Sequence, residues 1–404
     1  MKKLILFVAL FFLSVSLRAQ TDFVNDNILY HNLYPAELVE FLKANPDALL
    51  IDVRSPGEFA DTSSKQSLNI GHLKGAININ IETFEDRVNE IKDHTDKPVV
   101  LYCSHSQRSR RVSKYLSEQG FKKIYNLNGG MSLMNQLSES EFPGKKDMIV
   151  FNPPFKNLSV EEAGNLISAN RDILIIDLRP STQYAGNDTN TSYNLGKIKG
   201  AINIPYTEFS DNLSRLEQYK NNTVLIYDIN GAGNASANLL TQNGFTKVHH
   251  LIGGLAAFHR EGKSNAKKIY LENLPTYNIL NVYETLNLIK SKSDLIILDV
   301  RPADDFNNKA SMSHMNVGRL KHSLNLPPDK FASEVTKTVK DKKAAILIYG
   351  SGDDPARCAK LLKELGYENV NLLYGGLWSM VSVYANVKGY SFIKDYMENY
   401  EGMY

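Results

Sequence analysis

One block of sequence recurs three times along the chain, and this repeat constrains the fold more than any other feature. An apolar run ending in Asp-Val-Arg or Asp-Leu-Arg places its aspartate at Asp52, Asp177 and Asp299, so the copies lie 125 and 122 residues apart. In every copy a glycine follows the aspartate by 19 residues, and a further apolar run ends just before the position 51 residues after it. These periods exceed those of solenoid repeats, so each copy is predicted to be a whole small domain.

The length of 404 residues suits three such domains. We place them at residues 28–143, 150–262 and 276–385, with proline-containing linkers between them. A tail of residues 386–404 follows, and it is rich in aromatic side chains. The pattern does not indicate where this tail belongs in the fold.

Within each copy, short apolar runs alternate with helical patterns. Residues 99–102 are apolar on both faces, which is typical of a buried parallel strand. Val112, Tyr115 and Leu116 follow at the spacing of a helix with one buried face. We therefore predict an α/β fold of three tandem domains, each a small parallel sheet with helices on both faces. Ligands of such sheets bind at the carboxyl ends of the strands, where Cys103 is expected.

The amino terminus predicts export. Residues 1–3 are basic at two positions, residues 4–13 are all apolar, and Ala19 is a plausible cleavage site. This pattern indicates a secretory signal peptide over residues 1–19, so the mature chain is expected to be periplasmic or secreted. No later segment has the apolar length of a membrane span.

Composition excludes several classes of function. The 46 basic and 44 acidic residues leave a net charge of +2, which argues against nucleic-acid binding through bulk charge. Two cysteines cannot form a disulfide framework or a cysteine-rich zinc site. His249 and His250 lack a nearby ligand set, so no metal is expected.

The residues that follow the strand of Cys103 indicate nucleophilic chemistry. Small and polar residues lead from Cys103 into a helix that is expected to begin near Arg108 or Ser109. The amides of such a turn, the amino end of the helix, and Arg108, Arg110 and Arg111 all favour a thiolate and attract anions. Cys358 instead occupies a core-facing helix position and is predicted to be structural.

Taken together, these motifs resemble those of rhodanese domains, the sulfurtransferase fold. The resemblance covers nearly all of the expected mature chain, and it rests in the first copy on residues 51–54 with Glu58 and Phe59, and on residues 71–76, 103–109 and 125–130. It implies that Cys103 carries sulfur as a persulfide and that no cofactor is required. The persulfide would be held by the backbone amides of six loop residues, Ser104, His105, Ser106, Gln107, Arg108 and Ser109.

Two features depart from the family pattern. The 19-residue spacing from aspartate to glycine is longer than a compact rhodanese domain needs. Ser106 also stands where the family often has glycine, which is expected to alter the loop or the choice of acceptor.

The second and third copies are predicted to be inactive. Asp228 and Gly350 replace the cysteine, and the distance to the next helix-ending glycine is 16 residues instead of 17. The loops of these copies are also more acidic, which disfavours an anionic donor. These domains are expected to serve as scaffold, as a self-association surface or as binding sites for a protein partner.

Other conserved-looking positions of the repeat are assigned supporting roles. Asp52 and Arg54 recur in all three copies, including those without cysteine, so an ion pair or a hydrogen-bonded strand end is expected. His72 is replaced by Lys197 and Arg319 in the other copies and is interpreted as a rim or structural residue.

The preferred function is an exported sulfurtransferase that takes sulfur from thiosulfate or a similar donor and passes it to a thiol or cyanide. A non-catalytic sulfur carrier or partner-binding protein is the alternative. A cysteine phosphatase or arsenate reductase is disfavoured, because only four residues separate Cys103 from Arg108, where those enzymes have five.

Overall fold

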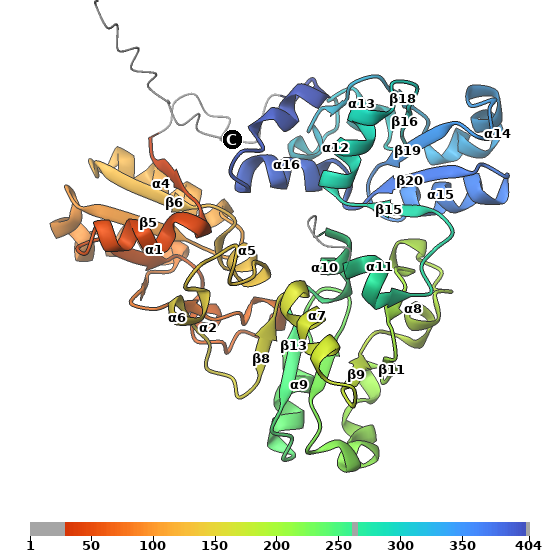
Figure 1. Ribbon diagram of the computed structural model, residues 1–404. Helices are drawn as coiled ribbons and strands as arrows, with labels where there is room; N and C mark the ends of the chain where they lie inside the picture. Colours follow the sequence, from red (N-terminus) through yellow and green to blue (C-terminus); the bar gives the residue numbers. More distant parts are fainter. Residues whose placement is uncertain (1–28, 261–265, 401–404) are drawn as a thin grey trace, which may run out of the picture.

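The computed structural model describes residues 29–260 and 266–400, which form three α/β units in succession (Figure 1). Each unit has a five-stranded sheet in which all strands are parallel. The order along the first sheet is β1, β6, β5, β2, β4, and the other two sheets repeat it with their equivalent strands. The predicted fold class is therefore confirmed. The expected signal peptide, residues 1–19, lies outside the described residues.

The strand bounds repeat from sheet to sheet. The first sheet contains β1 (His31–Leu33), β2 (Leu49–Asp52), β4 (Ile77–Asn78), β5 (Pro98–Tyr102) and β6 (Lys123–Leu127). The second contains β8 (Lys156–Leu158), β9 (Leu174–Asp177), β11 (Ile202–Asn203), β12 (Val224–Tyr227) and β13 (Val248–Leu251). The third contains β15 (Asn278–Leu280), β16 (Ile296–Asp299), β18 (Ser323–Asn325), β19 (Ala345–Tyr349) and β20 (Asn369–Leu373).

Most of the helices also correspond between units. The first unit has α1 (Pro35–Ala44), α2 (Pro56–Phe59), α3 (Phe84–Arg87), α4 (Gln107–Glu118), α5 (Gly130–Gln136) and α6 (Lys145–Met148). The second has α7 (Val160–Ala169), α8 (Ser181–Ala185), α9 (Asn234–Gln242), α10 (Gly254–Arg260) and α11 (Ala266–Tyr270). The third has α12 (Val282–Ser291), α13 (Ala303–Phe306), α14 (Pro328–Thr338), α15 (Asp354–Glu364) and α16 (Gly376–Asn386). No helix in the described ranges has both the length and the apolar character to cross a membrane.

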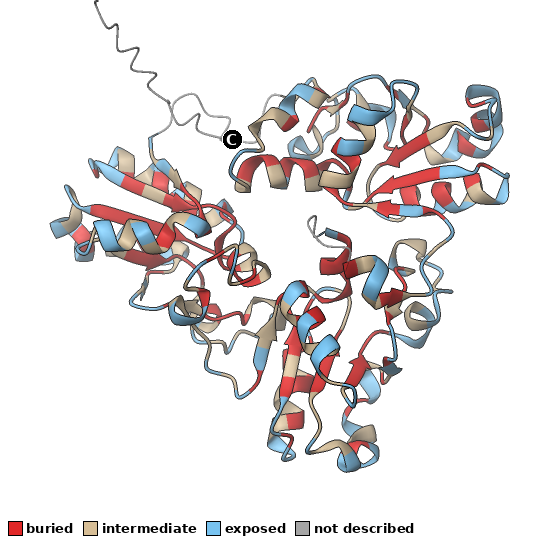
Figure 2. Cartoon of the chain, in the orientation of Figure 1, coloured by how far each residue is buried: buried red, intermediate tan, exposed pale blue. Residues whose placement is uncertain are grey.

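The central strands are buried on both faces (Figure 2). In β5, Val99 and Leu101 pack against α4 on one side of the sheet, in a core that also contains Phe84 of α3. Val100 and Tyr102 face the opposite side, where α1 and α5 cover the sheet. This continuous apolar run is what the sequence predicted, and it fixes the carboxyl end of β5 in the middle of the sheet edge.

The aromatic tail has a defined place in the third unit. Its strand β21 (Met397–Glu398) pairs antiparallel with β17 (Arg319–Leu320). The two linkers make the same pairing, as β7 (Ile149–Val150) with β3 (His72–Leu73) and β14 (Leu271–Glu272) with β10 (Lys197–Ile198). The described part of the tail is therefore the third copy of the linker.

The long segment between β2 and β3, and its equivalent in the second unit, connect neighbouring units. The 3₁₀ turn of the first unit, η1 (Gln66–Leu68), packs beside α9 of the second, where Asn234 donates to the carbonyls of Gln66 and Asn69 at 3.1 and 2.8 Å. The equivalent turn η4 (Thr191–Tyr193) meets the third unit, where Asp353 accepts from the Ser192 amide at 2.7 Å. The unusual spacing found in the sequence thus forms the contacts between units.

Candidate active site

Cys103 lies one residue beyond β5, at the carboxyl edge of the first sheet, as predicted. Its carbonyl accepts from the Met131 amide at 2.9 Å, and the Ser104 carbonyl accepts from the Ser132 amide at 3.0 Å. A Cβ atom on Gly130 would lie 2.2 Å from the Cys103 carbonyl oxygen, so only glycine allows this approach. The double glycine that closes the repeat therefore fixes the position of the cysteine loop.

The sulfur of Cys103 is almost fully buried, and a serine lies next to it. The side-chain hydroxyl of Ser109 lies 3.7 Å from the Cys103 Sγ and 2.6 Å from the Asn126 Oδ1. Cys103 itself is 1% exposed. A sulfur atom added to Cys103 would therefore extend toward the loop and not into open solvent.

The residues that follow Cys103, through the loop and into the first turn of α4, leave their backbone amides unpaired. Within residues 29–260 and 266–400, the backbone amides of residues 104–109 donate to no protein acceptor. Ser106 adopts a left-handed conformation with φ of 72°, which explains why glycine is common at this position in the resembled family. These six amides, of which those of residues 107–109 form the amino end of α4, thus remain free to bind an anionic group beside the sulfur.

Arg108 is bound to Glu58, a partner that the sequence did not reveal. Its guanidinium donates to both carboxylate oxygens of Glu58 at 2.7 Å and to the Ser104 hydroxyl at 3.0 Å. Burial alone would raise the pKa of Glu58, but hydrogen bonds from Arg108 and Ser55 and the Arg108 charge lower it to about 2. Arg108, which is predicted to attract an anion, therefore offers only part of its charge to one, because Glu58 already neutralises much of it.

Arg110 and Arg111 differ from each other. Arg111 is exposed on the surface of α4, whereas the Arg110 side chain is largely enclosed and hydrogen-bonds to Asn128 and to the third unit. Burial lowers the pKa of Arg110 to about 10. Arg110 is therefore a contact between units, whereas Arg111 remains a surface charge.

The outer face of the loop borders a cavity between the three units. His105 and Gln107 line it together with residues of the other two units, among them Asn230 and Ser351, and its volume is about 1300 Å³. Burial, followed by the nearby Arg108 charge, lowers the pKa of His105, and its Nδ1 lies 3.0 Å from the Ser104 hydroxyl oxygen. His105 therefore lies both against the cysteine loop and at the wall of this cavity.

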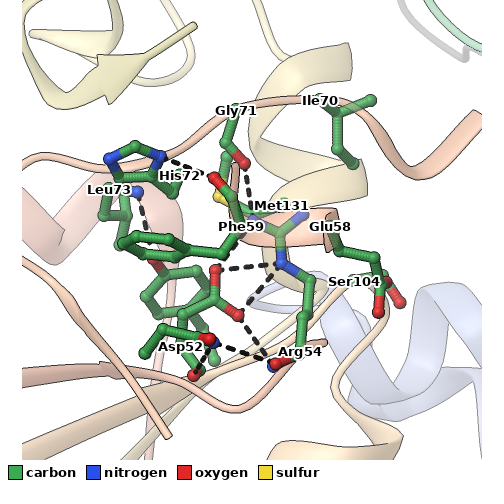
Figure 3. Close-up of polar contacts among 12 residues, drawn as sticks. Asp52, Arg54, Glu58, Phe59, Ile70, Gly71, His72, Leu73, Ser104 and Met131 are labelled. Atoms are coloured by element: carbon green, nitrogen blue, oxygen red, sulfur yellow. Dashed lines mark hydrogen bonds and ion pairs between the residues drawn. The ribbon is translucent and has the colours of Figure 1, made fainter. Parts of the chain in front are cut away.

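Asp52 and Arg54 form the expected structural ion pair (Figure 3). Both side chains are 0% exposed, and Arg54 also donates to the Gly71 carbonyl at 2.6 Å. The same pairing recurs as Asp177 with Arg179 and as Asp299 with Arg301. Because the pair is present in units without cysteine, it stabilises the repeated fold and has no role confined to the site.

His72 packs against Phe59 within the first unit. Its ring stacks on Phe59 with the ring centres 4.1 Å apart, and its Nδ1 lies 2.9 Å from the Phe59 carbonyl oxygen (Figure 3). The interpretation of His72 as a rim or structural residue agrees with this arrangement.

In the other two units, carboxylate side chains of the equivalent loops accept hydrogen bonds from different partners. In the second unit the carboxylate of Asp228 accepts from the amides of its own loop, at 3.1 Å from Asn230, at 2.8 Å from Ala232, and also from Gly231. In the third unit the Asp353 carboxylate of the loop accepts from the Ser192 amide, as described above.

Cys358 is a buried residue of α15, and burial raises its pKa to about 12. It is a structural thiol, as predicted.

The fold and the loop together define a class of protein, in which a parallel α/β domain presents a cysteine at the carboxyl end of its central strand, followed by a loop whose amides have no protein acceptor. The family described as Rhodanese-like domain matches residues 34–136, 159–261 and 282–381. The chain therefore belongs to the rhodanese-like family and contains three domains of it.

Individual relatives resemble parts of the chain. Uncharacterized protein YqhL of Bacillus subtilis is 45% identical over 91 residues, which cover 22% of this chain and 64% of that protein. The tRNA uridine(34) hydroxylase of Hamiltonella defensa is 31% identical over 127 residues, covering 28% of this chain and 33% of the relative. The chain thus spans less than two thirds of the length of either relative.

Two solved structures match the chain with low sequence identity and low TM-scores. A thiosulfate sulfurtransferase from Pseudomonas aeruginosa is 16% identical with a TM-score of 0.21, and the match covers 85% of this chain and 66% of that one. A rhodanese-related protein from Thermoplasma volcanium is 28% identical with a TM-score of 0.21, and the match covers 25% and 87%.

Proposed function

We propose that this protein is an exported sulfurtransferase in which the first unit alone is active and Cys103 carries the sulfur. The observation that carries the proposal is the placement of Cys103 inside a loop whose six amides, on residues 104–109, have no protein acceptor in the described chain. A persulfide at this position is an anion, and amides directed toward it stabilise its charge.

The reaction needs no group beyond the donor and the acceptor. The Cys103 thiolate attacks the outer sulfur of thiosulfate, the sulfur–sulfur bond of thiosulfate breaks, and sulfite leaves with the bonding electrons. A thiolate or cyanide then attacks the outer sulfur of the persulfide, which returns Cys103 to the thiolate. Arg108 holds Ser104 and Glu58 in place around the loop and supplies the remaining positive charge.

The equivalent loops of the second and third units lack a cysteine, and this supports a single active unit. Asp228 supplies an internal anion to the amides of the second loop, and the third loop has Gly350 in place of the nucleophile. Export rests on the sequence pattern of residues 1–19.

Transfer of sulfur from thiosulfate to cyanide tests the proposal through the thiocyanate formed. Wild type and Cys358→Ala are expected to turn over at similar rates, while Cys103→Ala is inactive. Turnover by Cys103→Ala equal to that of wild type would refute the assignment. One loading event without turnover would instead favour the sulfur-carrier alternative, and rapid hydrolysis of an aryl phosphate by Cys103 would favour a phosphatase.

A further inference from the structure

A chain of polar side chains leads from the sulfur of Cys103 to the third unit. Ser109, which lies 3.7 Å from the sulfur, bonds to the Asn126 Oδ1 at 2.6 Å. The Asn126 side-chain amide then donates to the Asn128 Oδ1 at 2.7 Å. Ser109, Asn126 and Asn128 are all fully buried, so these bonds are not weakened by competition with water.

The network crosses the boundary between units at the carboxyl end of α16. Asn128 donates to the Ala385 carbonyl at 3.2 Å. Arg110 donates to the side chain of Asn128, to the Ala385 carbonyl and to the Asn386 Oδ1, each at 3.1 Å. A cation at this position also complements the negative end of the helix dipole.

Asn386 also holds the backbone that supports the cysteine loop. Its Oδ1 accepts from the Gly129 amide at 3.1 Å. Gly129 precedes Gly130, which lies against the Cys103 carbonyl, and Met131, whose amide donates to that carbonyl. The third unit therefore reaches the loop by two routes, one through Arg110 and Asn128 and one through Gly129.

The network residues are found only in the unit that has the cysteine. Counting back from the glycine after each loop helix, Ser109 and Arg110 correspond to Gly233 and Asn234 in the second unit and to Pro355 and Ala356 in the third. Counting back from the double glycine, the equivalents of Asn126 and Asn128 are His250 and Ile252, and then Leu372 and Tyr374. Polar residues that merely stabilised the repeated fold would recur, as Asp52 and Arg54 do.

We propose that the third unit, although it lacks a cysteine, positions the catalytic loop of the first unit, and that Asn386 is the positioning residue at their contact. This inference rests on the proposed function for its catalytic part. It gives the third unit a defined role, which is to keep the Cys103 loop in the shape that directs its amides toward the sulfur.

The test compares substitutions at Asn386 in the full-length Cys358→Ala chain, where Cys103 is the one thiol. Asn386→Leu removes the acceptor for Gly129 and Arg110, whereas Asn386→Asp retains acceptor oxygens. Asn307→Leu is the matched control, because Asn307 also caps a helix of the third unit by donating to the carbonyl four residues earlier, at 2.8 Å. In Asn386 the corresponding bond to Ser382 is 2.9 Å.

Two measurements are made on each variant: kcat/KM for sulfur transfer from thiosulfate, and the rate at which iodoacetamide alkylates Cys103. We expect Asn386→Leu to lower kcat/KM at least tenfold and to speed alkylation at least fivefold, because a loosened loop exposes the sulfur without holding the persulfide. Asn386→Asp is expected to stay within threefold of its parent in both measurements, and Asn307→Leu within twofold.

Rates within twofold of the parent in Asn386→Leu would overturn the inference, as would equal changes in Asn307→Leu. A change in Asn386→Asp as large as that in Asn386→Leu would also contradict it. If the parent protein transfers no sulfur, the proposed function fails, while the alkylation rates still decide whether the third unit shapes the loop.

Discussion

At the scale of single residues, the ion pair between Glu58 and Arg108 is the main addition that the structure makes to the site. Glu58 belongs to α2, where Ser55 caps the helix and donates to the Glu58 carboxylate at 3.1 Å. The Glu58 side chain is 5% exposed and the Arg108 side chain 28% exposed. Breaking such an enclosed pair leaves an unpaired charge, which is more costly than losing a surface pair.

The lowered pKa of Glu58 predicts how stability depends on pH. Because its pKa is about 2 in the folded chain and near 4.5 when unfolded, the stabilisation is present above pH 4.5 and is lost as the pH falls toward 2. Between pH 5 and pH 3, the free energy of unfolding of wild type should fall by about 2 kcal/mol more than that of Glu58→Gln. Urea unfolding at the two pH values measures this difference, and equal decreases in both proteins would contradict the assignment.

Replacement of Gly130 is predicted to lower activity by displacing the backbone of the cysteine loop. A methyl group in Gly130→Ala meets the Cys103 carbonyl oxygen at 2.2 Å, so the loop must move. We expect sulfur transfer to fall more than tenfold. Gly120→Ala is the control, because Gly120 also has a positive φ, of 87°, but a Cβ there meets nothing within 4 Å. Left-handed strain alone costs about 1–2 kcal/mol and should leave transfer intact. Similar loss of transfer in both variants would show that the contact with Cys103 is not the cause.

At the scale of elements, much of the unit could be predicted from the sequence. The buried character of β5, the helix that follows it and the carboxyl-edge position of Cys103 follow from apolar periodicity, which local sequence records directly. The start of α4 at Gln107 differs from the expected Arg108 or Ser109 by one or two residues, because Ser106 takes the left-handed turn that precedes the helix. The pairing of Glu58 with Arg108 could not be predicted, since the two residues are 50 positions apart.

The loop of the second unit has Asp228 in place of the cysteine nucleophile. The Asp228 carboxylate takes three amides of its own loop, so its side chain occupies the place of an external anion. Asp228→Cys should therefore give no sulfur transfer in a Cys103→Ala background, because the loop remains one residue shorter and lacks an arginine equivalent to Arg108. Thiocyanate formation is the measurement. Turnover approaching that of wild type would mean that loop length and charge do not control activity.

At the scale of the whole molecule, the contacts between units were beyond sequence reasoning. Apolar residues of the second and third units share one core, in which Leu255 and Tyr277 take part together, and Ile252 of the second unit packs into the core of the first. Such contacts depend on how the folded units pack together, and the periodicity of apolar residues within one helix or strand does not predict that packing. The long spacing after Asp52 was visible in the sequence, but its role in joining units became clear only from Asn234 and Ser192.

These contacts suggest why three units persist in one chain. Two loops that bear no cysteine take part in packing between units, through Asn234 at the start of α9 and Asp353 before α15. The loop of the first unit keeps its cysteine and meets the end of α16 through Arg110. Under the proposed function, the molecule consists of one catalytic unit held by two supporting units.

The most direct test of this account is the intact mass of the purified protein before and after incubation with thiosulfate, followed by removal of excess donor. The account predicts a gain of one sulfur atom in wild type and in Cys358→Ala, no gain in Cys103→Ala, and loss of the added sulfur when cyanide is supplied. An unchanged mass in wild type, or the same gain in Cys103→Ala, would contradict it.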